Sequence, residues 1–228
     1  MMAADIFPKR ADSMITIVDY QMGNLRSVQK AVERAGVEAK ISSDPHEIAS
    51  AERLILPGVG AFGDAISEIR NRDLEQPLLD FLAADKPFLG ICLGLQLLLE
   101  RSFEHGEHRG LGVIPGEVAR FELPPSEGQV WKIPHMGWNA VHPGPAGAGL
   151  GIRPGTHFYF VHSYYVRPED PQCVALTCDY GGPFCAAVRR GNLLATQFHP
   201  EKSQRDGLSL IERFATGRLL QAGESVSQ

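Results

Sequence analysis

Residues 89–96 read LGICLGLQ and place Cys92 between two glycines, at the end of an apolar run. A cysteine that only fills space in a core needs no such frame. A nucleophile on a sharp turn from strand to helix does need it, because the turn leaves little room for neighbouring side chains. The unpaired N–H groups at a helix start would also favour a thiolate. The turn by itself fits a buried structural cysteine and a reactive one equally well.

A base for this thiol could come from the segment ATQFHPEKS, residues 195–203. His199 and Glu201 are two residues apart, so on an extended chain both side chains would point to one side. A histidine can accept the thiol proton, and a neighbouring carboxylate can fix its tautomer and stabilise the imidazolium. The alternative is a chance pair on an exposed strand end. Together with Cys92, the pair predicts a triad of nucleophile, base and orienting carboxylate.

An oxyanion hole could be formed by the glycine-rich segment LPGVGAFG, residues 56–63. This segment has neither the lysine of a P-loop nor the spacing of a dinucleotide fingerprint, and its other interpretation is a tight turn. Glycines allow backbone N–H groups to turn inward. We therefore expect the N–H of Val59 or Gly60 to act together with the N–H of Leu93, directly after the nucleophile.

The remaining cysteines, Cys173, Cys178 and Cys185, form no C-x-x-C pair and no regular disulfide framework. They are predicted to be small hydrophobic core residues rather than metal ligands. A reducing, cytoplasmic setting is the simplest interpretation of this cysteine usage. We expect no metal site and no cofactor.

The composition of the 228 residues fits one α/β domain, since a hydrophobic fraction of 43% is enough for a sizeable core. The net charge of −5 with no block of lysine or arginine makes nucleic acid an unfavoured partner. No apolar stretch reaches membrane-spanning length, and the first residues lack the apolar centre of a signal peptide. We expect a flexible extension over residues 1–13 and a single domain over 14–222.

The first half of the chain alternates strand-like and helix-like segments. Strands are predicted at 14–20, 37–42, 51–60 and 86–92, and helices at 24–36, 61–84 (broken near Pro77) and 93–102. This alternation predicts a parallel sheet with helices on both faces. Cys92 would then lie at the carboxyl edge of the strands, where ligands bind in open α/β sheets.

The second half changes character. Residues 116–200 contain a series of strand-like runs separated by turn residues and by a Pro/Gly-rich loop at 142–155, and helix returns only at 205–223. The predicted fold class is therefore α/β, with an open, mixed, mainly parallel sheet flanked by helices and an additional antiparallel strand region in the second half.

Several segments together are more specific than the cysteine and histidine motifs alone. They are DYQMGNLRSV (19–28), LPGVGAFGDA (56–65), GICLGLQ (90–96), PHMGWN (134–139), FYFVHSYY (158–165) and FHPEKS (198–203). From about Met14 to about Leu220, the chain resembles the class I (triad) glutamine amidotransferases. Among them it is most similar to the glutaminase subunits of imidazole glycerol phosphate synthase, from histidine biosynthesis.

The resemblance implies a specific chemistry. Cys92 attacks the side-chain amide of glutamine, His199 with Glu201 protonates the departing ammonia, and water hydrolyses the glutamyl thioester. In this family the ammonia passes to a cyclase (β/α)₈-barrel subunit of a heterodimer. The cyclase makes imidazole glycerol phosphate and an aminoimidazole carboxamide ribotide. The isolated glutaminase is nearly silent until the cyclase binds its ligand, and a peptide flip in the PGVG loop would provide a physical basis for this.

The resemblance also implies roles for further residues. Those that match the glutamine pocket are Gly60, Gln96, Glu104, Ser163 and Tyr164. Those that match the contact with the cyclase are Trp138, Asn139, Tyr159 and Lys202. From the sequence alone, Glu104 would be a solvated carboxylate, Tyr164 a strand aromatic and Trp138 a core residue.

Three other functions use parts of the same pattern. Another class I amidotransferase, of the anthranilate or aminodeoxychorismate type, would lack the PHMGWN and FVHSYY segments. A stand-alone cysteine peptidase or γ-glutamyl hydrolase would turn over glutamyl peptides without any partner. A non-catalytic interaction module would have no use for an intact Cys92, His199 and Glu201.

Overall fold

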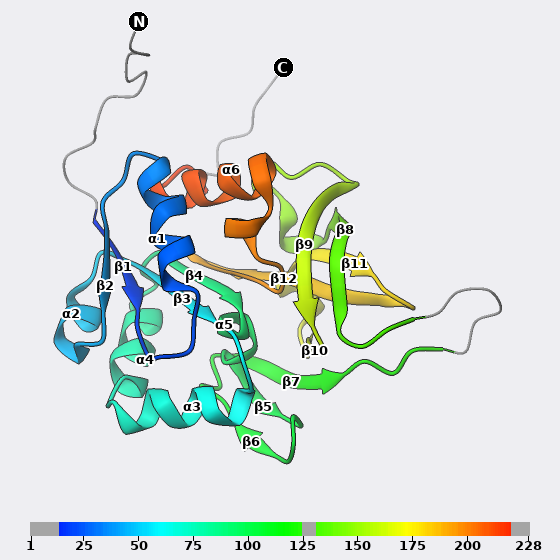
Figure 1. The fold of residues 1–228 in the computed structure, drawn as a ribbon, viewed down its shortest axis with the longest axis horizontal. Helices are drawn as coiled ribbons and strands as arrows, with labels where there is room; N and C mark the ends of the chain where they lie inside the picture. Colours follow the sequence, from blue (N-terminus) through cyan, green and yellow to red (C-terminus); the bar gives the residue numbers. More distant parts are fainter. Residues whose placement is uncertain (1–13, 125–130, 220–228) are drawn as a thin grey trace, which may run out of the picture.

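The computed structural model of the protein describes residues 14–124 and 131–219. The predicted flexible extension at 1–13 and the last residues of the predicted domain, 220–222, lie outside the described residues. The described chain forms one mixed sheet of 13 strands (Figure 1). No helix in the described ranges is both long and apolar enough to cross a membrane.

The predicted parallel half of the sheet is present. Its strands follow the order β2-β1-β3-β4-β13, and each pair of neighbours is parallel. These strands are β1 (Ile15–Val18), β2 (Ala39–Ser42), β3 (Arg53–Gly58), β4 (Phe88–Cys92) and β13 (Leu193–Thr196). The central strands β3, β4 and β13 are buried along nearly their whole length, as expected for a parallel sheet covered on both faces.

Helices cover both faces of the parallel half. One face packs against α2 (Pro45–Ser50), α3 (Phe62–Asn71), α4 (Glu75–Ala83) and the short α5 (Leu93–Gln96). The other packs against α1 (Leu25–Arg34) and α6 (Gln204–Ala215), which lie side by side in Figure 1. The carboxyl ends of β3 and β4 meet at one edge, where Gly58 is paired with Cys92.

The second half extends the sheet with mostly antiparallel strands, as the sequence predicts. Beyond β13 the order continues through β12, β10, β7, β5 and β6, while β8, β9 and β11 branch off β12. The strands are β5 (Leu99–Ser102), β6 (His108–Arg109), β7 (Ile114–Arg120), β8 (His135–Pro143), β9 (Thr156–His162), β10 (Tyr164–Pro168), β11 (Val174–Asp179) and β12 (Pro183–Arg190).

Three predicted elements differ from the structure. The helix expected over 93–102 ends at Gln96. Leu97 and Leu98 form a buried turn, and Leu99 already begins β5. The helix expected over 61–84 is interrupted before Glu75 rather than near Pro77. Pro77 lies in the first turn of α4, where its missing N–H removes no helical hydrogen bond. One of the strand-like runs within 116–200, the run at 157–166, is divided at Ser163 into β9 and β10.

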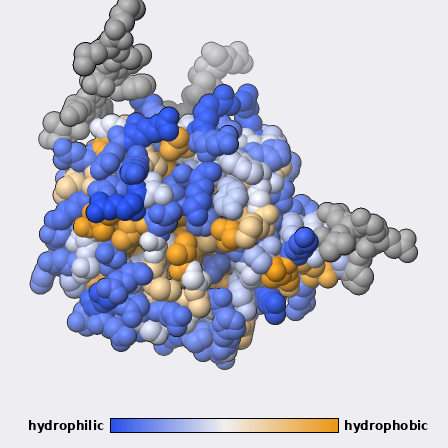
Figure 2. All heavy atoms as spheres, in the orientation of Figure 1, coloured by the Kyte–Doolittle hydropathy of each residue, from blue (hydrophilic) through white to orange (hydrophobic). Residues whose placement is uncertain are grey.

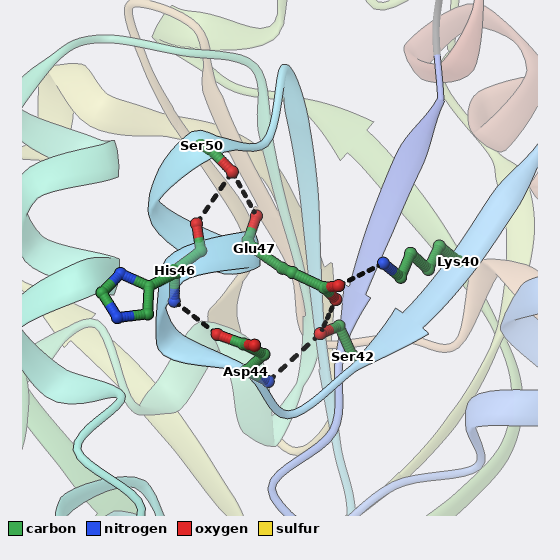
Figure 3. Close-up of polar contacts among 6 residues, drawn as sticks. All are labelled: Lys40, Ser42, Asp44, His46, Glu47 and Ser50. Atoms are coloured by element: carbon green, nitrogen blue, oxygen red, sulfur yellow. Dashed lines mark hydrogen bonds and ion pairs between the residues drawn. The ribbon is translucent and has the colours of Figure 1, made fainter.

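The helix α2 was not predicted, although its start carries recognisable signals. Asp44 caps it by accepting a hydrogen bond from the His46 N–H at 2.8 Å, and Pro45 occupies the first helical position. Glu47 in the first turn accepts hydrogen bonds from Lys40 and, at 2.5 Å, from the Ser42 hydroxyl (Figure 3). The bonds from Lys40 and Ser42 lower the pKa of Glu47. These contacts attach α2 to β2 at the end of the sheet.

Candidate active site

Cys92 is the last residue of β4 and immediately precedes α5, with φ = 55° and ψ = −106°. A positive φ at a residue other than glycine is strained, at a cost of about 1–3 kcal/mol, and such strain concentrates at functional sites. The turn is tight because α5 approaches β3 closely: a Cβ on Gly94 would overlap the Leu56 carbonyl oxygen. The residue is 7% exposed, so the site is largely shielded from solvent.

His199 and Glu201 form a buried pair beside this turn. The imidazole Nδ1 lies 2.9 Å from Glu201 Oε1, and the two side chains are 2% and 1% exposed. The pair does not arise from strand alternation, as the sequence reasoning assumed. β13 ends at Thr196, and Pro200–Lys202 form a 3₁₀ turn that brings the carboxylate back to the ring. Because a carboxylate accepts hydrogen bonds, Nδ1 carries a proton and donates it.

The charge state of His199 is set by opposing effects. Burial lowers the pKa of His199, but Cys92 and Glu201 raise it, and the resulting pKa is about 10. The ring is therefore protonated at neutral pH, next to a sulfur that can carry negative charge. His199 Nε2 and Glu201 Oε2 have no hydrogen-bond partner among the described residues. Nε2 is thus available for proton transfer to a bound substrate.

Gln197 is a residue of this site that the sequence reasoning missed. Its Nε2 lies 3.7 Å from Cys92 Sγ, and the side chain is fully buried. Its Oε1 accepts a hydrogen bond of 3.2 Å from Gln96 Nε2, which also donates to the Tyr164 carbonyl at 3.0 Å. The sequence offered one signal for it: Gln197 is a polar residue at the end of an apolar run, two residues before His199.

The predicted oxyanion loop lies beside Cys92 but does not present all its donors. The Val59 N–H donates to the Met22 carbonyl at 3.3 Å, and the Val59 side chain is 39% exposed. Gly60 has φ = 99°, a conformation that favours glycine. Leu93 is the first residue of α5, where N–H groups have no partner within the helix. In this conformation Val59 can reach an oxyanion only after its bond to Met22 breaks.

The structure brings several of the predicted pocket residues to the same edge of the sheet. Gln96 and Tyr164 are in direct contact through the hydrogen bond described above. Ser163 lies between β9 and β10, and its carbonyl accepts from the Phe121 N–H at 3.2 Å. Glu104 is not simply solvated: its Oε2 accepts a bond of 2.7 Å from the Phe62 N–H, the first of α3.

Three of the four residues predicted to meet the cyclase lie on one surface. Trp138 is 46% exposed, not in the core, and it is directly opposite Tyr159 on β9, with ring centroids 6.2 Å apart. Lys202 is exposed in the 3₁₀ turn after Glu201. The Asn139 side chain instead donates to the Asp179 carbonyl at 2.8 Å and also contacts His135, so it is committed to contacts within the chain.

Other hydrophobic surface is limited. On the face drawn in Figure 2, hydrophobic side chains form small groups between larger hydrophilic areas. Next to Trp138, and on the same side of β8, Met136 is 62% exposed.

The remaining cysteines are buried and free, as predicted, and burial raises the pKa of Cys178 to about 12. These three thiols are therefore poor nucleophiles at neutral pH.

Comparison with known proteins agrees with this geometry. The family model of class I glutamine amidotransferases matches residues 16–216. The imidazole glycerol phosphate synthase subunit HisH of Rhodopirellula baltica is 74% identical over 203 residues, which cover 89% of this chain and 97% of that protein. The corresponding subunit of Syntrophotalea carbinolica is 53% identical and covers 88% of this chain and 98% of that protein.

Solved structures agree at the level of the fold. A crystal structure of a glutamine amidotransferase superposes with a TM-score of 0.67 at 21% identity, covering 89% of this chain and 98% of the other. The matching family model, the high identity to HisH subunits and the shared fold lead to one conclusion: the chain belongs to the class I glutamine amidotransferases, among the HisH subunits of imidazole glycerol phosphate synthase.

Proposed function

We propose that Cys92, His199 and Glu201 hydrolyse glutamine to glutamate and ammonia through a glutamyl thioester on Cys92. The observation that carries this proposal is the buried His199–Glu201 pair, whose imidazole interacts with the strained Cys92 and whose Nε2 has no hydrogen-bond partner among the described residues. Such a pair holds the imidazolium in place before the reaction begins, so no free energy is needed to orient it during the reaction.

The reaction balances in two stages. The Cys92 thiolate attacks the γ-amide carbon of glutamine and forms a C–S bond, while the amide oxygen takes the negative charge. His199 gives its Nε2 proton to the nitrogen, the C–N bond breaks and ammonia leaves. A water molecule then gives a proton to Nε2 and attacks the thioester carbon. The C–S bond breaks, glutamate is released, and the thiolate and imidazolium are restored.

The negative oxygen needs donors, and Leu93 and Val59 are the groups that we assign to it. The Leu93 N–H follows the nucleophile directly, whereas the Val59 N–H is bound to the Met22 carbonyl. One oxyanion donor is worth about 10²–10³ in rate. A chain with Val59 in its present position would therefore be a slow glutaminase, and rotation of the Gly58–Val59 peptide would activate it.

The pocket residues and the partner follow from the same assignment. We propose that Gly60, Gln96, Glu104, Ser163 and Tyr164 bind the amino-acid end of glutamine. We further propose that the exposed surface with Trp138, Tyr159 and Lys202 docks a cyclase (β/α)₈ barrel, which receives the ammonia. Supporting this, the similar proteins named above are subunits of a synthase rather than whole enzymes. The four free thiols fit a cytoplasmic enzyme.

The test is an assay of glutamate release with and without the cyclase subunit and its ribotide ligand, using wild type and Cys92→Ala. We expect slow hydrolysis by the isolated chain, strong stimulation by the liganded partner and loss of both with Cys92→Ala. Equal stimulated activity in Cys92→Ala would refute the catalytic assignment. Efficient turnover of γ-glutamyl peptides without a partner would favour a stand-alone hydrolase instead.

A further inference from the structure

Tyr20 lies two residues after the end of β1 and has no role in the chemistry described so far. Its side chain is fully buried, and its hydroxyl has no hydrogen-bond partner among the described residues. A buried hydroxyl without a partner costs free energy, and most such groups in folded proteins are paired. The Tyr20 hydroxyl therefore keeps its hydrogen-bonding capacity for a group that could move toward it.

The hydroxyl lies against the oxyanion loop. A Cβ on Gly58 would overlap the Tyr20 hydroxyl oxygen, and the same Cβ would be 2.8 Å from Leu93 Cβ and 3.2 Å from Gly94 N. The hydroxyl thus occupies the side-chain space of Gly58, close to the start of α5. Burial raises the pKa of Tyr20, and the nearby Cys92 adds to this effect. The oxygen therefore keeps its proton and can act as a donor.

The adjoining peptide is the one whose rotation the proposed mechanism requires. The Val59 N–H is held by the Met22 carbonyl, and the Gly58 carbonyl belongs to the same rigid peptide plane. Turning the N–H toward the oxyanion necessarily moves the Gly58 carbonyl out of its present position. The moved carbonyl then needs a donor. Among the described residues, Tyr20 provides the only buried side-chain donor without a partner that lies against Gly58.

We propose that Tyr20 is a positioning residue whose hydroxyl donates a hydrogen bond to the Gly58 carbonyl when the Gly58–Val59 peptide turns toward the oxyanion. The two loop conformations then exchange one bond for another: Val59 N–H to Met22 in one, Tyr20 O–H to Gly58 in the other. Because the Tyr20 bond exists only in the productive conformation, it shifts the population toward that conformation. This inference rests on the proposed glutaminase function.

The experiment uses Tyr20→Phe, which removes only the oxygen, in the complex with the cyclase subunit and its ligand. The matched control is Tyr180→Phe, which removes a hydroxyl that donates to the Lys132 carbonyl at 2.8 Å. We expect Tyr20→Phe to lower the kcat for glutamine about 5- to 50-fold with an unchanged KM and an unchanged or higher melting temperature. Tyr180→Phe should keep kcat and lower the melting temperature.

Two further results decide the interpretation. Alkylation of Cys92 by iodoacetamide needs no oxyanion hole, so its rate should be equal in wild type and Tyr20→Phe. A slower rate would mean that the hydroxyl acts on the thiolate and would overturn the proposal, as would a full kcat or a lower melting temperature in Tyr20→Phe. An inactive wild-type complex would overturn the glutaminase function itself, whereas an active wild type with an equally active Tyr20→Phe would overturn only the role of the hydroxyl.

Discussion

Two buried polar clusters lie close together in this protein, and they differ in how completely their atoms are paired. The first, the histidine pair, consists of His135 and His162 with Asn139 and the Tyr164 carbonyl. The second, the triad cluster, consists of Cys92, His199 and Glu201 with Tyr20. Among the described residues, four buried side-chain polar atoms lack a hydrogen-bond partner, and three of them belong to the triad cluster.

The histidine pair is a closed chain of hydrogen bonds. His162 Nδ1 lies 2.8 Å from the Tyr164 carbonyl, His135 Nδ1 lies 3.0 Å from His162 Nε2, and Asn139 Nδ2 lies 3.3 Å from His135 Nε2. A carbonyl only accepts, so His162 must carry its proton on Nδ1, which makes its Nε2 an acceptor for His135. Both rings are therefore neutral Nδ1–H tautomers. In agreement, burial lowers the pKa of His135 to about 4 and that of His162 to about 3.

The comparison separates stabilising polar groups from reactive ones. Where every donor meets an acceptor, a buried network fixes the surrounding strands, here β8, β9 and the start of β10. Where buried polar atoms are left unpaired, the free energy of unfolding is lower, but the unpaired groups stay available for a substrate. The same residue type, histidine, should therefore respond in opposite ways to one substitution in the two clusters.

The largest effect is expected from His199→Asn. The asparagine Nδ2 takes the place of Nδ1 and keeps a donor for Glu201, but nothing replaces Nε2. Partner-stimulated glutamine hydrolysis should fall by about 10³-fold or more. The free energy of unfolding should be close to that of wild type when it is measured above pH 10, where the charge of His199 no longer contributes. Steady-state kinetics and urea unfolding measure both quantities. A large loss of stability with substantial remaining activity would reverse the distinction between the clusters.

The matched substitution in the histidine pair is His162→Asn. It keeps a donor for the Tyr164 carbonyl but leaves the His135 Nδ1–H buried without an acceptor. We expect the free energy of unfolding to fall by about 1–3 kcal/mol, measured by urea unfolding at pH 7.5, with a much smaller change in activity than for His199→Asn. A stability equal to wild type would show that the chain of bonds contributes little.

The two clusters should also respond to opposite ends of the pH scale. The pKa values of His135 and His162 are lowered to about 4 and about 3, so their contribution is complete above the unfolded value of 6.5 and is lost as the pH falls through those values. The pKa of His199 is raised to about 10, so its contribution is complete below 6.5 and is lost as the pH rises through 10.

Each histidine should contribute a slope of up to about 1.4 kcal/mol per pH unit between its unfolded and folded pKa values. Unfolding free energies measured from pH 4 to pH 10 test this. Glu201→Gln should weaken the decline on the alkaline side and leave the acid side unchanged. An equal effect of Glu201→Gln on both sides would contradict the assignment of the two slopes.

The smallest effect is expected from Lys202→Ala, which lies outside both clusters on the exposed turn after Glu201. Its stability should remain within about 0.5 kcal/mol of wild type. Stimulation by the cyclase should fall only a few-fold, measured as glutamate release against partner concentration. A loss of basal activity comparable to that of His199→Asn would place Lys202 inside the triad cluster.

Much of this arrangement could be predicted from the sequence, because it follows from patterns of neighbouring residues. The alternation of apolar runs and helical spacing predicts the parallel half of the sheet, and the glycines around Cys92 predict the turn. The residues that pair over long distances could not be predicted. His135 and His162 meet only through the register of β8 and β9, and the Val59 bond to Met22 joins two loops.

Two features depend on tertiary pairing that the sequence does not show. The Asn139 amide donates to the Asp179 carbonyl because β8 pairs with β11, and its contact with the cyclase stays a prediction. The length of α5 was predicted too long, because the segment LQLLL fits a buried helix and a buried strand equally well. The alternation reasoning placed His199 and Glu201 together correctly, although a 3₁₀ turn rather than a strand achieves it.

The most direct test of the central claim is the mass of the peptide that contains Cys92, taken from a complex quenched in acid while it turns over glutamine. We expect a γ-glutamyl thioester on Cys92 that disappears when hydroxylamine is added and never forms in Cys92→Ala. Glutamate release without any adduct on Cys92, or an adduct on Cys173, Cys178 or Cys185 instead, would contradict the account.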